Sequence, residues 1–273
     1  MAYKSILVVA SGQTSDAEVI GAAAKLAARF SAQVSVAPAF PDPAADLVYY
    51  GATLQASGEA TARIVDSERG AQERLEALGR EVAARERAAI AVEKRALQPI
   101  VALAPAAILA DVVMFAGDAA RTSLAGLFAE TLLSTRAPVM LIKGDAVVGG
   151  AAAVAWDGSA QAARAIRAAM PLLQAASRVL LMRNIDDETK ESEASDVGRL
   201  RAHLARHGVG TIEMRDLRGA RVADSLLDAA RADQCDLLVA GAYGRPRLFE
   251  MVLGGTTRAL VNAAGAPNLL LSH

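Results

Sequence analysis

The chain has 273 residues, of which 53% are hydrophobic and 22% are charged, a composition typical of a globular protein with room for two domains. The net charge of −1 gives no basic excess that would favour nucleic acid or an anionic membrane as a partner. The single cysteine, Cys235, excludes an internal disulfide and a cysteine-based zinc site, and it suits a reducing compartment.

The first half alternates strand and helix patterns. Helical periodicity predicts helices at 15–30, 59–89, 99–109 and 124–135, and Ser15-Asp16-Ala17-Glu18 fits a capping box. Short apolar runs predict five buried strands at 4–10, 33–37, 90–97, 111–116 and 138–142. This alternation predicts a parallel sheet with helices on both faces.

The same plan repeats after a turn-prone connector at 143–150. We expect strands at 151–156, 178–184, 210–217, 236–240 and 267–271, and helices at 159–173, 186–206 and 221–231, with a last helix after Thr257. The predicted fold class is therefore α/β, with two tandem domains at 1–146 and 147–273. Each domain is expected to hold an open, parallel, five-stranded sheet.

The first residues enter a strand pattern without the features of a signal peptide, so we expect a cytoplasmic protein. The longest apolar stretch, at 100–117, is interrupted by Pro105 and Asp111. It is expected to form a short helix and a strand rather than a membrane span.

One stretch has the residue types and spacing of a ligand site. After the strand at 236–240, Gly241 and Gly244 open a loop, and Gly254 and Gly255 lead into a helix. The start of a helix carries unpaired amide donors and partial positive charge, and glycines let a phosphate approach the backbone. The sequence therefore predicts an anion site at this loop.

The first half lacks this loop. The span from Gly117 to Pro138 is five residues shorter than the span from Gly241 to Pro267, and it has no glycine pair. Ser11 also stands at the end of the first strand, where the second half has Asp157. Open α/β sheets bind ligands at the carboxyl ends of their strands, so we expect a degenerate site in the first half.

The spacing Gly241-x2-Gly244-x9-Gly254 resembles the nucleotide-binding signature of the universal stress protein (UspA) family. The resemblance covers nearly the whole chain as two tandem Usp domains. It implies a Rossmann-like, adenine nucleotide alpha hydrolase-like fold and a regulatory or signalling role in the stress response. It also implies ATP, or AMP or ADP, as the ligand, with Mg as a candidate metal ion bound together with the nucleotide. The chain departs from the signature at Gly255, where the family has Ser or Thr.

The resemblance also implies roles for individual residues. The triphosphate would lie on the loop and the helix start, and Asp157 would bind the adenine or ribose. Ala155 and Trp156 would flank the base, and Asn184 would lie near it. Arg245 either neutralises phosphate or belongs to a solvated loop. The expected binding residues are Ala155, Trp156, Asp157, Asn184, Gly241, Gly244, Arg245, Gly254, Gly255, Thr256 and Thr257.

Catalysis has little support in the sequence. Phosphoryl transfer usually needs a metal with dedicated ligands, and only Asp157 and Glu250 are acids near the loop. His203 and His207 are four residues apart, but no third metal ligand is evident, so exposed helix polarity is expected. We therefore expect a protein that is not an enzyme, with slow ATP hydrolysis left open.

The alternative from another class is an interaction or scaffold protein of the same fold that binds no nucleotide, and Gly255 favours it. The resemblance further implies that the two domains pack through their last strands. It leaves a homodimer and an unidentified protein partner open. No nucleic acid or membrane partner is expected, and no metal site made of protein ligands.

Overall fold

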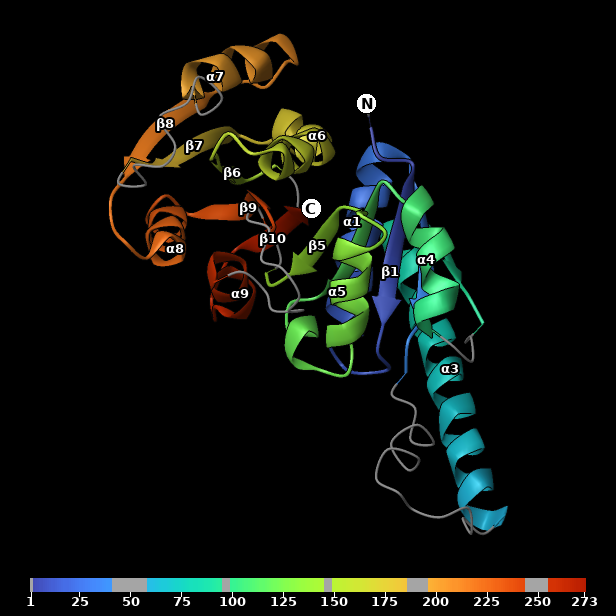
Figure 1. Cartoon of the computed structure of the whole chain (residues 1–273). Helices are drawn as coiled ribbons and strands as arrows, with labels where there is room; N and C mark the ends of the chain where they lie inside the picture. Colours follow the sequence, from blue (N-terminus) through green and yellow to red (C-terminus); the bar gives the residue numbers. More distant parts are fainter. Residues whose placement is uncertain (1, 41–57, 95–98, 145–148, 186–195, 244–254) are drawn as a thin grey trace.

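The structure is a computed structural model and describes residues 2–40, 58–94, 99–144, 149–185, 196–243 and 255–273 (Figure 1). The first half contains β1 (Ser5–Ala10), α1 (Asp16–Phe30), β2 (Gln33–Pro38), α3 (Gly58–Glu86), β3 (Ala89–Val92), α4 (Pro99–Leu109), β4 (Val112–Ala116), the short 3-10 helix η1 (Ala119–Arg121), α5 (Ala125–Leu133) and β5 (Val139–Ile142). The second half contains β6 (Ala151–Ala155), α6 (Ala160–Ala175), β7 (Arg178–Asn184), α7 (Val197–Arg206), β8 (Ile212–Leu217), α8 (Val222–Ala232), β9 (Cys235–Gly241), α9 (Gly255–Asn262) and β10 (Asn268–Ser272).

The strands form one sheet in the order β3-β2-β1-β4-β5-β10-β9-β6-β7-β8. All neighbouring strands are parallel except β5 and β10, which pair antiparallel with Leu269 opposite Leu141. The predicted α/β class is confirmed, and the two five-stranded units share a single sheet. Both strands at the join are wholly buried, and apolar residues form β5 and the centre of β10, so each strand covers the edge that the other would expose.

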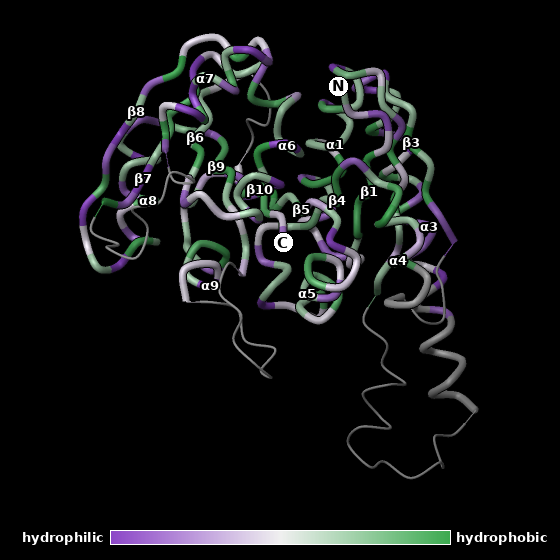
Figure 2. The backbone as a smooth tube through the Cα atoms, turned by 45° about the horizontal axis from the view of Figure 1, so that its top comes forward, coloured by the Kyte–Doolittle hydropathy of each residue, from purple (hydrophilic) through white to green (hydrophobic). Residues whose placement is uncertain are grey.

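Side chains alternate between the two faces of the sheet, as the two-residue period of a strand requires. Ile6 and Val8 of β1 belong to a core that includes α1, α3, α6 and α7, whereas Leu7 and Val9 belong to a core that includes α4, α5, α8 and α9. Figure 2 shows hydrophobic colour along the interior strand β1 and hydrophilic segments on the edge strand β8. Helices therefore cover both faces, as predicted.

The two halves are also joined by side chains beyond the sheet. The Nζ atom of Lys143, just after β5, donates to the carbonyl oxygens of Val261 at 2.6 Å, Ala263 at 3.1 Å and Leu260 at 3.4 Å. These carbonyls lie at the end of α9, where a cation is favoured by the helix dipole. A lysine of the first half thus holds the helix that starts at the predicted loop of the second half.

Two sequence predictions fall partly outside the described residues. The predicted boundary between residues 146 and 147 lies there, as does the segment 186–195, which was expected to begin the helix α7. In the part of the chain that the structure describes, no helix combines the length and the apolar character that crossing a membrane requires.

Candidate functional site

The predicted ligand residues of the second half gather at one edge of the sheet. β6 lies between β7 and β9 and is parallel to both. The carboxyl ends of the three strands therefore meet at the same edge, which brings Asp157, Asn184 and Gly241 together at the place where open α/β sheets bind ligands. Gly244, Arg245, Glu250 and Gly254 lie outside the described residues.

Asp157 and Ser159 shape the start of α6. The Asp157 carboxylate accepts a hydrogen bond from the Ser159 N–H at 3.0 Å, and the Ser159 hydroxyl accepts one from the Ala162 N–H at 3.1 Å. Ser159 is thus a side-chain N-cap of α6, with the extended backbone that this position favours. Asp157 is half-buried and is held in place by the turn that leads into the helix.

Ala155 and Trp156 point to opposite faces of the sheet. Ala155 packs against the core on the α8 and α9 side, and Trp156 packs against the core on the α6 and α7 side. The backbone N–H of Trp156 donates a hydrogen bond to the carbonyl oxygen of Met182 at 2.9 Å, which continues the hydrogen-bond ladder between β6 and β7. The indole Nε1 is buried and has no hydrogen-bond partner among the described residues. The two residues predicted to flank the base therefore approach the strand end from different faces.

Asn184, the last residue of β7, is half-buried and donates from Nδ2 to the carbonyl oxygen of Gly219 at 2.9 Å. This bond ties β7 to the connection between β8 and α8. Asn184 stands at the expected strand end, and its amide has a structural role there.

Gly241 is required by packing. A Cβ atom on this residue would lie 2.5 Å from the backbone nitrogen of Ala162 and 2.9 Å from the carbonyl carbon of Gln161. The first turn of α6 therefore passes directly over the end of β9, and only glycine leaves space for it. The sequence analysis predicted a glycine here so that phosphate can approach the backbone. The structure shows that helix packing also requires glycine at this position, without any ligand.

The described ends of the loop are held together. The Tyr243 N–H donates to the Thr257 hydroxyl oxygen at 3.4 Å, and the Tyr243 ring packs edge-on against His273 with ring centroids 5.8 Å apart. Tyr243 has a φ of 60°, which marks a sharp change of chain direction after β9. Burial raises the pKa of Tyr243 to about 12, so its phenol stays neutral at physiological pH.

The first turn of α9 presents Gly255 and Thr256 to solvent, whereas Thr257 is only 5% exposed. A Cβ atom on Gly255 would meet nothing within 4 Å. The position that departs from the signature therefore has room for the Ser or Thr that the signature carries.

The equivalent edge of the first half is closed by its own side chains. The Asp16 carboxylate accepts hydrogen bonds from the N–H groups of Ser11 at 2.9 Å and Gly12 at 2.7 Å, and Asp16 is 3% exposed. Burial raises the pKa of this carboxyl, while the hydrogen bonds from Ser11 and Gly12 oppose the shift. An internal carboxylate thus satisfies amide donors that an external anion would otherwise meet.

Phe40 covers the same edge. Its ring is buried, and its Cδ1 atom would lie 2.9 Å from a Cβ atom on Gly12. Sequence reasoning missed both closing groups, because Asp16 was assigned to a capping box and Phe40 stands in a proline-rich stretch. The capping-box prediction was wrong: Ser15 makes no side-chain cap, and the Asp16 carboxylate turns to the preceding loop.

The histidine pair does not form a metal site with other described residues. The rings of His203 and His207 lie 4.4 Å apart between centroids. Across the described ranges, no group of three or more His, Cys, Asp or Glu side chains is placed to hold a metal ion.

Comparison with known proteins agrees with this architecture. Residues 152–271 match the model of the Universal stress protein family. The crystal structure of a universal stress protein from Archaeoglobus fulgidus aligns over 99% of this chain and 96% of its own, with a TM-score of 0.71 and 15% identity. A functionally unknown protein from Pseudomonas aeruginosa aligns over 99% of this chain and 92% of its own, with a TM-score of 0.58 and 13% identity. No curated protein matches the chain.

Proposed function

We propose that the chain is a member of the universal stress protein family, whose model matches residues 152–271, and that its second half binds an adenine nucleotide, with ATP as the leading candidate. The site would lie at the carboxyl ends of β6, β7 and β9. The observation that carries the proposal is the meeting of three residues at one sheet edge: Asp157, Asn184 and Gly241, the last residue of β9.

In this proposal the adenine and ribose lie beside Asp157, with Ala155, Trp156 and Asn184 near the base. The phosphates lie on the backbone from Gly241 to Gly255, and Thr256 and Arg245 complete their surroundings. The exposed first turn of α9 supports this, because unpaired amide donors at a helix start favour an anion. Mg²⁺ would be held mainly by phosphate oxygens and water, as this ion prefers.

We further propose two functional domains, 1–146 and 147–273, of which only the second binds nucleotide. The closure of the first site by Asp16 and Phe40 supports this asymmetry. The role would be regulatory rather than catalytic, in the cytoplasm: a bound nucleotide alters the surface around the loop, and a partner protein or a second copy of the chain responds to it.

The second candidate is an interaction protein of the same fold that binds no nucleotide. Gly255 favours it, because a hydroxyl is missing at the helix start.

Mass spectrometry of small molecules released from the heat-denatured, purified protein separates the two candidate functions. Co-purified ATP, ADP or AMP in the parent and its loss in Gly244→Val would support nucleotide binding. Absence of nucleotide in both, after purification from cells and after incubation with ATP, would favour the scaffold. Phosphate release with and without Mg²⁺ tests for slow hydrolysis.

A further inference from the structure

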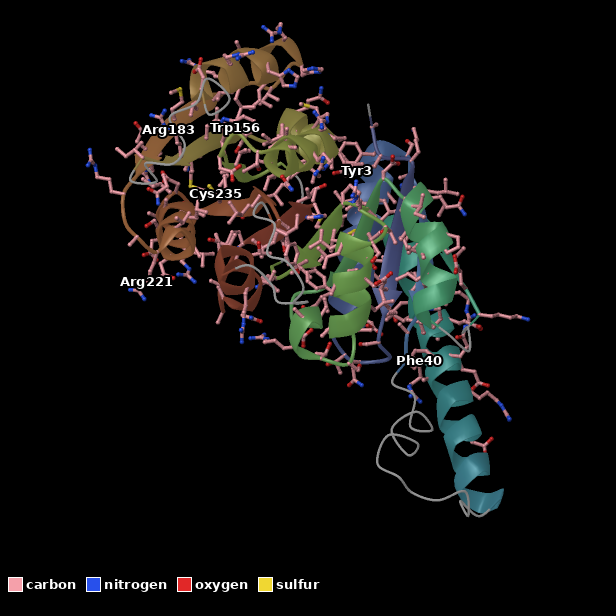
Figure 3. The ribbon with its side chains drawn as sticks, in the orientation of Figure 1. Tyr3, Phe40, Trp156, Arg183, Arg221 and Cys235 are labelled. Atoms are coloured by element: carbon pink, nitrogen blue, oxygen red, sulfur yellow. The ribbon has the colours of Figure 1, made fainter. Side chains whose placement is uncertain are left out.

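A cavity of about 600 Å³ lies between α6 and α7, on one face of the sheet. Its volume falls within the range of roughly 300–1,000 Å³ that small-molecule sites occupy. The lining comes from the end of β6, the first half of α6 and the whole length of α7. Figure 3 shows Trp156 on the side of β6 that faces these two helices.

The inner wall of the cavity is apolar. Ile166 and Leu200 are buried at 2% and 6% exposure, and the half-buried indole of Trp156 lies beside them. The Trp156 Nε1 donor is buried and has no partner in the described ranges. A flat apolar group with a hydrogen-bond acceptor would match this wall.

The outer wall is basic. Arg167, Arg199, Arg206 and His203 line it, and the acid that lines it, Asp196, already accepts hydrogen bonds from two backbone N–H groups at the start of α7. None of the three arginines forms an ion pair with a described acidic residue. Burial lowers the pKa of His203, with His207, Arg206 and Arg167 adding to the effect, which reflects the positive surroundings. Guanidinium groups of this kind match carboxylate, sulfonate and phosphate oxygens.

The first half fills the corresponding space. There the helix α3 packs against α1 and buries Leu75 and Val82 at 3% and 1% exposure, with Leu78 partly buried beside them. In the second half α7 packs on β7 and β8, and the space beside α6 is the cavity. The cavity therefore lies where the first half has a packed pair of helices.

The basic wall of the cavity lies away from the start of α9, where the phosphates are proposed to bind, although Trp156 belongs to both proposed sites. Trp156, α6 and α7 belong to the core on one face of the sheet, whereas α9 and Tyr243 belong to the core on the other. The start of α9 and the arginine wall thus lie on different sides of the sheet.

We propose that this cavity is a second ligand site, which binds a small amphipathic anion. The apolar body would lie against Trp156, Ile166 and Leu200, and the acidic group would meet Arg167, Arg199 and Arg206. The inference does not depend on nucleotide binding.

The chain contains one tryptophan, so Trp156 reports occupancy without a label. The test is a titration of the full chain with 8-anilinonaphthalene-1-sulfonate, which joins an aromatic body to a sulfonate, followed by energy transfer from Trp156. The neutral N-phenyl-1-naphthylamine serves as the matched probe. We expect one sulfonate probe per chain in the parent. The double substitution Arg199→Gln with Arg206→Gln should weaken it roughly tenfold or more and leave the neutral probe unchanged.

Arg201→Gln is the matched control, because Arg201 is exposed on the same helix but does not line the cavity. The Arg201→Gln variant should bind the sulfonate probe with the affinity of the parent. The Gly244→Val variant, which changes only the nucleotide loop, should do the same. Circular dichroism checks that each variant is folded. The proposal would be overturned by any of three results. These are a loss of sulfonate-probe affinity in Arg201→Gln equal to that in the double variant, no energy transfer from Trp156, or competitive displacement of the probe by ATP.

Discussion

The backbone N–H of Tyr243 donates to the hydroxyl oxygen of Thr257 across 3.4 Å and thereby joins the two described ends of the predicted phosphate loop. Thr257 is 5% exposed, so its hydroxyl serves the loop rather than solvent. Thr256, one residue earlier, is exposed in the first turn of α9. Of the two threonines after Gly255, the first is therefore exposed and the second is part of the framework.

Thr257→Val should loosen this join, because valine keeps the shape of threonine and removes the acceptor. We expect the free energy of unfolding to fall by about 1 kcal/mol, the usual net value of such a hydrogen bond. Hydrogen exchange at the Tyr243 amide should become faster. Thr256→Val is the control, and it should leave both quantities unchanged. Unaltered Tyr243 exchange in Thr257→Val would contradict the role assigned to this hydroxyl.

Gly255→Ser should strengthen nucleotide binding. The added side chain meets open space and restores a hydroxyl at the first residue of α9. We expect the dissociation constant for ATP to fall by roughly threefold to tenfold, as one additional hydrogen bond to a charged group allows. Gly255→Ala is the control, because it stiffens the backbone without adding a hydroxyl. Calorimetry measures all three proteins, and equal affinities for the serine and alanine variants would show that the hydroxyl makes no contact.

Gly241→Ala should destabilise the fold itself. Its Cβ atom would overlap the backbone of Ala162 and Gln161, which belongs to a helix and cannot move aside cheaply. We expect a loss of about 1–3 kcal/mol in the free energy of unfolding, as overpacking typically costs. Gly126→Ala is the control: it lies inside α5 with nothing within 4 Å of its Cβ atom, so it should be neutral or stabilising. Equal chemical-denaturation midpoints for the two variants would contradict the close approach of α6 to β9.

The pKa of Cys235 sets a fourth prediction. Burial at the start of β9 raises this pKa to about 11. A thiolate is the reactive form, so a disulfide reagent at pH 8 should label the native chain far more slowly than the unfolded chain. Between the unfolded pKa near 9 and the folded pKa, the folded state holds more protons, so stability from this group falls as pH rises. Cys235→Ala should reduce the fall in the free energy of unfolding over this pH range. Native labelling as fast as unfolded labelling would refute the assignment.

Periodicity in the sequence was sufficient to predict the class of the fold. Uninterrupted apolar runs such as Ile6–Val9 predicted strands buried on both faces, and the two cores confirm it. The sharing of one sheet by both halves does not follow from periodicity, because pairing of β5 with β10 depends on two strand edges far apart in the chain. The family resemblance, rather than any local pattern, suggested that pairing.

The site could be predicted only in part. Glycine spacing located the loop, but it could not separate a glycine that packing demands, Gly241, from one that meets open space, Gly255. The capping-box prediction gave Asp16 no partner, whereas its carboxylate accepts hydrogen bonds from the N–H groups of Ser11 and Gly12, which lie before the helix. The α6–α7 cavity was not foreseen, since it depends on how far two helices stand apart, and their sequences do not encode this locally.

Calorimetric titration of the full chain with ATP and Mg²⁺ tests the central claim most directly. We expect one nucleotide per chain in the parent and no binding in Gly244→Val. Gly210→Val, a control whose Cβ atom would meet nothing within 4 Å, should bind like the parent. Two nucleotides per chain would contradict the closure of the first half by Asp16 and Phe40, and no heat with the parent at millimolar ATP would contradict nucleotide binding itself.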